Sequence, residues 1–113
     1  MKFRFEKNLK IINELMTFLH KLGSNNINVT ICTEEESTNI LLSGEVPNLN
    51  KEKLETLVNA LNTQRQHEIE EYYWNTLGDY ETDNQLSIIG MMIDKSEVTF
   101  NNNILTIKLY RID

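Results

Sequence analysis

The sequence predicts an α+β fold, a two-layer sandwich with two or three helices on one face of a mostly antiparallel sheet of about five strands. Three observations lead to this prediction. Apolar residues recur at three- and four-residue spacing near residues 8–22 and 50–61, which is typical of amphipathic helices. They alternate with polar residues near 27–32 and 104–110, which is typical of half-buried strands. Every amphipathic element must bury its apolar face, and layering helices on one sheet achieves this.

The length and composition favour one intracellular domain. A chain of 113 residues is long enough for one packed core and short for two, so we expect a single domain over residues 1–113. The lone Cys32 cannot close an intramolecular disulfide, and we expect it to be reduced. The charged N-terminal residues lack the apolar stretch of a signal peptide, and no run is long enough to span a membrane. We therefore expect a cytoplasmic protein, and its many Asn, Ile and Lys residues fit an AT-rich bacterial or phage genome.

The first element is a helix. Phe3 and Phe5 alternate with charged residues and form either a short edge strand or two anchors ahead of that helix. From Asn8 to Leu22 one helical face is apolar and carries Leu9, Ile12, Leu15, Met16, Leu19 and Leu22. Gly23 follows, where a C-terminal cap is expected.

A hairpin is predicted next. The segment Ile27–Cys32 alternates strictly and is rich in β-branched residues, so Ile27, Val29 and Ile31 should face inward. A turn with three glutamates follows, and the segment Asn39–Leu42 is predicted to be the returning strand.

The middle of the chain is helical, and its length is ambiguous. Asn50 is the predicted N-cap, followed by Leu54, Leu57, Val58 and Leu61 on one face. The helical phase can continue to Leu77, but a single helix would then be about 40 Å long, which exceeds the usual width of such a domain. The sequence favours a break near Asn62, with Thr63 as a new N-cap in a capping box with Gln66.

A three-stranded meander is predicted for the C-terminal third. Gly78 is the expected C-terminal cap of the preceding helix, and residues 79–85 form a polar loop. The run Leu86–Ile93 is apolar at nearly every position and is predicted to be a central strand. Residues 97–100 and 104–110 are the last two strands, joined at the Asn101–Asn103 turn, since Asn tolerates left-handed conformations.

The charge layout excludes general affinity for nucleic acid backbones. The formal net charge is −6, whereas such binding needs Lys and Arg to neutralise phosphates. The interval from Gln66 to Ile93 carries six acids and no Lys or Arg, and it includes Tyr72, Tyr73 and Trp74. Consecutive helical residues point in different directions, so at least one of these rings should be exposed. Such an interval is either a solvated surface or a binding patch, since Tyr and Trp are enriched at interfaces.

The sequence contains no clear catalytic, cofactor or metal signature. No GxSxG, Walker or GxGxxG segment is present, and nothing in the sequence brings His20 or His67 near Cys32. The helical segment at His67 lacks the second His of an HExxH site, and residues 79–90 lack the Gly and Glu of an EF-hand loop. We expect neither an enzyme nor a bound cofactor. A weaker alternative is a divalent-metal or small-ligand site near His67, Glu71, Asp79 and Asp83.

The expected function is therefore a small acidic interaction or regulatory module, for example an inhibitor or immunity-type protein that blocks a basic enzyme. Its predicted interaction patch consists of Glu70, Glu71, Tyr72, Tyr73, Trp74, Asp79 and Tyr80. The expected partner is a protein with a basic surface, or a second copy of the chain. A homodimer would use an exposed edge of the sheet, such as the last strand, 104–110.

Overall fold

A computed structural model describes residues 3–77 and 84–113. In chain order the elements are α1 (Arg4–Lys21), β1 (Ile27–Thr33), β2 (Ser37–Glu45), α2 (Lys51–Leu61), α3 (His67–Tyr73), the 3-10 helix η1 (Trp74–Thr76), α4 (Asn84–Gly90), β3 (Lys95–Asn101) and β4 (Ile104–Ile112). The predicted α+β class is confirmed. The details differ, because these residues form four strands and four α-helices where about five strands and two or three helices were predicted.

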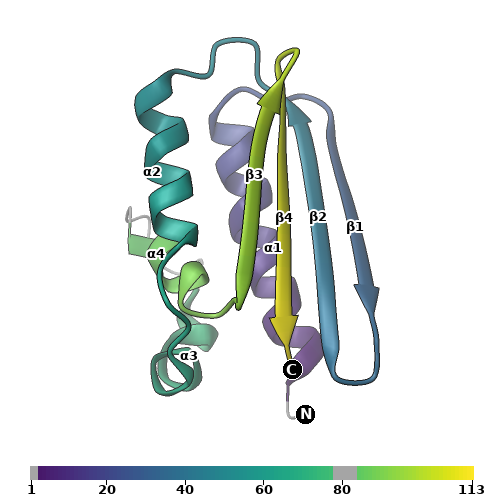
Figure 1. The fold of residues 1–113 in the computed structure, drawn as a ribbon, viewed down its shortest axis with the longest axis vertical. Coiled ribbons are helices and arrows are strands. Elements are labelled where there is room, and N and C mark those ends of the chain that lie inside the picture. The colour runs from purple at the N-terminus through teal and green to yellow at the C-terminus, as the bar shows by residue number, and fades with distance from the viewer. Residues whose placement is uncertain (1–2, 78–83) are drawn as a thin grey trace.

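The sheet is antiparallel throughout and has the order β1-β2-β4-β3 (Figure 1). Two hairpins, β1–β2 and β3–β4, meet where β2 pairs with β4. The prediction that the last strand is an edge is wrong, because β4 lies between β2 and β3. The edges of the sheet are β1 and β3.

The core lies between the helices and one face of the sheet. Along β2 and β4 buried residues alternate with more exposed ones, with Ile40 and Leu42 on β2 and Leu105, Ile107 and Leu109 on β4 turned inward. Helix α1 adds Ile11, Leu15 and Leu19 to this core, α2 adds Leu57 and Leu61, and the α4 region adds Ile89, Met92 and Ile93. One sheet face is therefore covered, as the alternating pattern predicts.

Helix α1 starts four residues earlier than predicted, at Arg4, so Phe3 and Phe5 do not form a strand. Phe3 is the N-cap residue, with a φ of 61°, and Phe5 lies in the first helical turn. The predicted cap at Gly23 is confirmed: its φ is 94°, and the N–H of Ser24 donates to the carbonyl of Leu19. Glycine is suited to this position because it adopts positive φ without a Cβ clash.

The break after Leu61 is confirmed. The Asn50 side chain caps α2 by accepting from the N–H of Lys53, α2 ends at Leu61, and α3 begins at His67. The predicted N-cap at Thr63 is wrong, since Gln66 occupies that position of α3. Residues 62–66 instead form a connection whose end is tied by a hydrogen bond from the N–H of Gln66 to the carbonyl of Met91.

The largest error in the sequence-based prediction is the segment 86–93, which forms α4 and a turn where a central strand was predicted. A short, continuously apolar run suits either a buried strand or a buried helix. Here α4 packs against α1, α2 and α3, so several sides of the helix are covered. A Cβ on Gly90 would lie 2.0 Å from the carbonyl oxygen of Ala60, which shows how closely α4 approaches α2.

The final hairpin agrees with the prediction. Asn102 and Asn103 have φ values of 51° and 65° and join β3 to β4. With α4 in place of the expected strand, the C-terminal meander is reduced to this hairpin. Across the described ranges 3–77 and 84–113, no helix is long and apolar enough to cross a membrane.

Candidate interaction surface

Helix α3 and the adjoining η1 have one inward and one outward face. Residues four apart share a helical face, and Glu70 and Trp74 are the pair that points inward. The Trp74 ring belongs to the core and lies 5.2 Å from the Phe3 ring, measured between centroids. Glu70 is buried among basic side chains. Because both inward residues are anchored, the outward face of α3 is held in a defined orientation.

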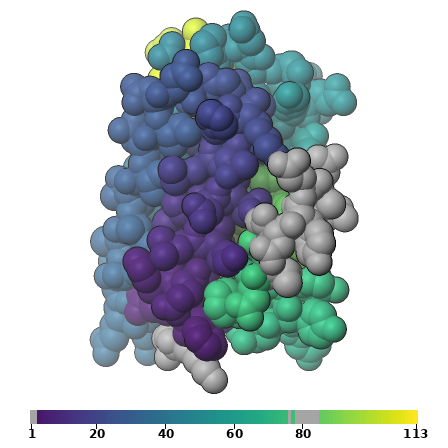
Figure 2. Space-filling view, turned by 180° about the vertical axis from the view of Figure 1, so that it is seen from behind, coloured from purple at the N-terminus to yellow at the C-terminus, as the bar shows by residue number. Residues whose placement is uncertain are grey.

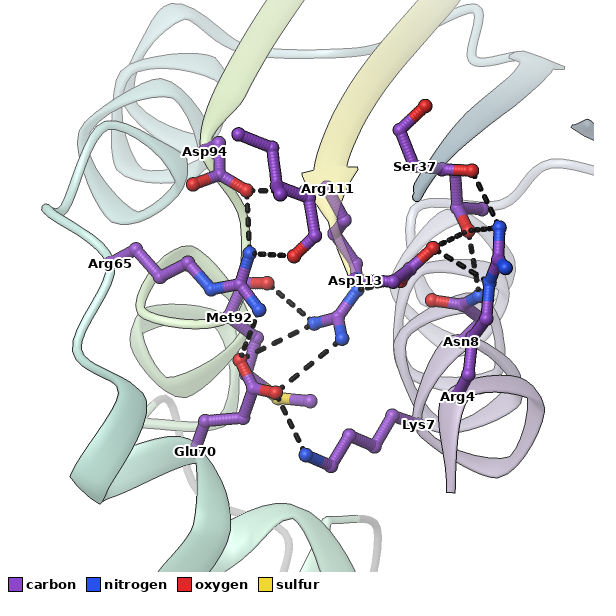
Figure 3. Close-up of polar contacts among 12 residues, drawn as sticks. Arg4, Lys7, Asn8, Ser37, Arg65, Glu70, Met92, Asp94, Arg111 and Asp113 are labelled. Atoms are coloured by element: carbon purple, nitrogen blue, oxygen red, sulfur yellow. Dashed lines mark hydrogen bonds and ion pairs between the residues drawn. The ribbon is translucent and has the colours of Figure 1, made fainter. Parts of the chain in front are cut away.

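Glu70 lies at the centre of a buried ionic cluster (Figure 3). Its carboxylate oxygens lie 3.0 Å from the Nζ of Lys7, 3.1 Å from a guanidinium nitrogen of Arg65 and 3.4 Å from one of Arg111. The side chains of these four residues are at most 8% exposed. Arg111 also donates to the carbonyl of Met92 at 2.5 Å. Side chains from α1, α3, β4 and the loop before α3 therefore meet at one carboxylate.

A second buried carboxylate, that of Asp113, extends this cluster toward α1. Its Oδ2 lies 2.7 Å from the Nε of Arg4, and its Oδ1 lies 3.7 Å from the Nε of Arg111. The Thr38 hydroxyl donates to Oδ2 at 2.6 Å and accepts from the side-chain amide of Asn8 at 3.2 Å. The guanidinium of Arg4 also donates to the carbonyls of Ser37, Glu34 and Glu35. These contacts tie the start of α1 to the β1–β2 turn.

The cluster shifts the pKa values of its members. Burial on its own would raise the pKa of Glu70, but Arg111, Lys7 and Arg65 outweigh it and hold that pKa below its ordinary value of 4.5. Burial likewise opposes protonation of Lys7, yet its hydrogen bonds to Glu71 and Glu70 raise its pKa above 10.5. Both shifts favour the ionised forms, the carboxylate of Glu70 and the ammonium group of Lys7. The cluster is therefore charged at neutral pH.

The outward face of α3 combines acids with aromatic rings. We define the docking face as Glu68, Glu71, Tyr72 and Tyr73. Tyr72 is 77% exposed and Tyr73 44%, and their ring centroids lie 4.9 Å apart. Glu71 is largely exposed and forms an ion pair with Lys7 at its inner side. The docking face thus presents two neighbouring aromatic rings next to two carboxylates.

The predicted patch is divided by this geometry. Glu71, Tyr72 and Tyr73 lie on the surface, which agrees with the expectation that at least one ring is exposed. Glu70 and Trp74 are buried and support the face from within, because both lie on the inward side of the helix. The remaining members of the patch, Asp79 and Tyr80, lie outside the described residues.

The predicted metal set is only partly described. His67 and Glu71 are exposed on α3, whereas Asp79 and Asp83 lie outside the described residues, so the four-residue set stays a prediction. Among residues 3–77 and 84–113, no three His, Cys, Asp or Glu side chains are grouped closely enough to hold a metal ion. A cavity of about 320 Å³ lies beside His67. Four basic side chains, Arg4, Lys7, Arg65 and Arg111, line it together with the three acids Glu70, Glu71 and Asp113.

The basic partners of Glu70 were not predicted from the sequence. Arg111 could have been found, because it continues the inward alternation of Leu105, Ile107 and Leu109 along β4. Arg65 lies on the apolar face when the phase of α2 is extended past Leu61. For Lys7 we find no comparable signal, because its burial depends on where α3 lies.

No protein-family model matches this chain, and no curated protein is significantly similar to it.

Proposed function

We propose that this chain is a small interaction module that binds a protein with a basic surface through the docking face of α3. The observation that carries the proposal is the exposure of Tyr72, at 77%, next to Tyr73 and the carboxylates of Glu68 and Glu71. Tyr is enriched among the residues that dominate binding energy at interfaces. Such a ring brings a large apolar contact area with little loss of conformational freedom.

The charge of the face and of the chain favours a basic partner. The net charge of −6 attracts basic proteins over a range of about 8–10 Å at physiological ionic strength. Complementary charge mainly increases the association rate and excludes acidic competitors. An inhibitor that blocks a basic enzyme is one concrete form of this function.

Anchoring from within supports the same proposal. Glu70 and Trp74 fix the helix on its inner side, so Tyr72 and Tyr73 are presented from a backbone that is already ordered. A surface that needs little ordering on binding keeps more of its contact energy as affinity.

The test compares two double variants of matched chemistry. Glu68→Lys with Tyr72→Ala removes one acid and one large apolar side chain from the docking face. Glu97→Lys with Ile104→Ala makes the same kinds of change on the sheet, at exposed residues of β3 and β4. Glu71 is left intact because it contacts Lys7, and a lysine there would disturb the buried cluster.

The wild-type chain and both variants are used to capture proteins from a lysate of the native host, and each captured protein is purified for kinetic measurements. The proposal expects a basic protein that is retained by the wild type and the sheet variant and binds the docking-face variant at least about tenfold more weakly. Its association rate with the wild type should fall as salt is added. Recovery of no such protein, or equal binding by the two variants, overturns the proposal.

The alternative of a divalent-metal or small-ligand site is tested separately. A ligand that binds only the folded chain raises its melting temperature. Melting curves with calcium, magnesium, manganese and zinc that match the metal-free curve would remove the metal alternative.

A further inference from the structure

The edge strand β1 differs from the other edge strand in a way that points to a partner. Exposed edges normally carry charges, prolines or bulges that prevent pairing with another chain. β3 follows this rule with Lys95 and Glu97. The seven residues of β1, Ile27–Thr33, include no charged residue and no proline, and their pairing with β2 runs without a bulge. In the part of the chain that the structure describes, no strand pairs with the outer side of β1.

An apolar stripe of α1 lies beside this edge. Phe5, Leu9, Ile12 and Met16 are spaced by four, three and four residues, so they form one line along the helix. Phe5 is 57% exposed, Leu9 44% and Met16 38%, whereas Ile12 is buried at the inner margin of the stripe.

The stripe faces the β1 side of the molecule. Lys7 and Lys10 lie on the opposite flank of α1, where they contact Glu70 and Leu77. Phe5 lines a surface hollow together with Thr33, the last residue of β1. Figure 2 shows α1 in purple, with the blue strands on one side and the green α3 segment on the other. Arg4 and Glu6 also line this hollow, so the uncharged strand β1 and the apolar stripe of α1 lie next to each other with one basic and one acidic residue at the Thr33 end.

We propose that this surface binds a second copy of the chain, with β1 pairing antiparallel to β1 of that copy about a two-fold axis at Thr30. This proposal goes beyond the docking face of α3, because it uses the other flank of α1. In this register Val29 lies opposite Ile31 of the second copy, and Asn28 lies opposite Cys32. Thr30 faces its own counterpart. Apolar residues thus meet at the centre of the inner face, where Val29 lies opposite Ile31, whereas Ile27 lies opposite Thr33 at the two ends, and polar or small residues meet on the outer face.

The same rotation brings the two α1 stripes together. A two-fold interface uses one patch twice, so a patch must complement itself. The helices then run antiparallel, with the exposed Phe5 of one copy toward the Met16 end of the other. Because neither β1 nor the four stripe residues are charged, two acidic chains can pair here without placing like charges opposite each other along the strands or the stripes.

Charges at the rim of this interface are complementary. The turn that follows β1 contains Glu34, Glu35 and Glu36. In the proposed register this turn reaches the start of the partner copy's β1, where α1 has just ended at Lys21 and His20 is exposed. An acidic turn is therefore brought toward a basic helix end at both sides of the axis.

The expected contact is modest in size. β1 spans about 23 Å and α1 about 27 Å, so a strip extending over both layers buries on the order of 500 Å² per copy. The total of about 1,000 Å² is near the lower bound for a specific interface. We therefore expect a dimer that dissociates on dilution.

Disulfide trapping tests the register directly. Asn28→Cys places a cysteine opposite Cys32 of the second copy, and directly opposed residues of an antiparallel pair are close enough for a disulfide. Under mild oxidation this variant should become a covalent dimer of twice 13.3 kDa that separates on reduction. Adding Cys32→Ser should abolish the crosslink. Thr99→Cys is the control. It introduces a thiol at an exposed position of the other edge strand, β3, and measures how fast disulfides form by random collision.

The oligomeric state is then measured by light scattering over a concentration series. We expect the wild type to approach twice the monomer mass, Thr30→Lys to remain monomeric because two lysines meet at the axis, and Thr99→Lys to behave as the wild type. A monomeric wild type at every concentration overturns the proposal. The proposal is also overturned if Thr30→Lys forms a dimer, or if the disulfide crosslink forms no faster in Asn28→Cys than in Thr99→Cys. None of these substitutions lies on the docking face. A result that overturns the dimer therefore leaves the proposed function of that face unaffected.

Discussion

Replacement of Glu70 by Gln tests whether the buried ionic cluster stabilises the fold. The change preserves the shape of the side chain and removes its charge. It leaves Lys7, Arg65 and Arg111, all at most 8% exposed, without the carboxylate they share. Removing one partner of a buried ion pair costs about 3–5 kcal/mol. Since the amide retains some hydrogen-bonding capacity, we expect a loss near the lower end, about 3 kcal/mol. For a chain of this length that corresponds to a melting temperature lower by roughly 12 °C.

Glu71→Gln is the matched control, because Glu71 is the next residue and contacts the same Lys7. Its side chain is 65% exposed, so solvent screens the pair and the expected loss is at most about 1 kcal/mol. Urea unfolding of the wild type and both variants measures the free energies, with equal slopes required for a direct comparison. A Glu70→Gln loss no larger than the Glu71→Gln loss would refute the reasoning.

The pH dependence provides an independent check with a defined sign. The pKa of Glu70 is lowered on folding, so its stabilising contribution is present above the unfolded value near 4.5 and is lost as pH falls through the folded value. The stability difference between the wild type and Glu70→Gln should therefore shrink below pH 4.5. The pKa of Lys7 is raised, so its contribution is complete below 10.5 and is lost at higher pH. A stability difference between the wild type and Glu70→Gln that stays constant on acidification would contradict the lowered pKa of Glu70.

Three further substitutions test the packing of α4 against α2, the N-cap of α2 and the carboxylate of Glu14. Gly90→Ala should cost about 1–3 kcal/mol in urea unfolding, because the new Cβ would lie 2.0 Å from the backbone oxygen of Ala60. Gly44→Ala should cost less, because its Cβ would lie 2.6 Å from the rotatable hydroxyl of Ser24 and at least 3.4 Å from every other neighbouring atom. Asn50→Ala should cost about 1 kcal/mol through loss of the α2 cap, and an unchanged unfolding midpoint would contradict that role. Burial raises the pKa of Glu14 against the opposing effect of Lys21 and Lys10, so its ionisation opposes folding above pH 4.5. Glu14→Gln should therefore stabilise the chain at pH 7 by less than about 1 kcal/mol, with no gain near pH 4.

Local rules were sufficient for the elements whose evidence lies within a few residues. The cap at Asn50, the glycine after α1 and the asparagine turn before β4 depend on local backbone geometry, and all three were predicted correctly. The alternation of β4 was also sufficient, because a strand with one covered face must alternate, whereas along the edge strand β1 only Ile27 and Ile31 are half-buried and Val29 is 37% exposed. The segment 86–93 failed because continuous apolarity reports burial and not the type of element.

The burial of Glu70 at the candidate site could not be predicted from the local sequence pattern. Glu70 and Glu71 are neighbours of the same residue type, and one is buried while the other is exposed. The difference arises because β4 and α1 bring Arg111 and Lys7 to the inner side of α3. A buried acid becomes favourable only when such partners are present.

The sequence by itself determined the α+β class, the approximate positions of most helices and strands, the acidic charge and the aromatic residues of α3, because these depend on composition and on periodicity within one segment. Only the tertiary structure decided that β4 is central, that β1 is an uncharged edge and that Glu70 is held by Lys7, Arg65 and Arg111. These properties depend on which segments become neighbours across dozens of residues. Strand order and burial are set by the packing of all the elements together, so no single segment of the sequence encodes them.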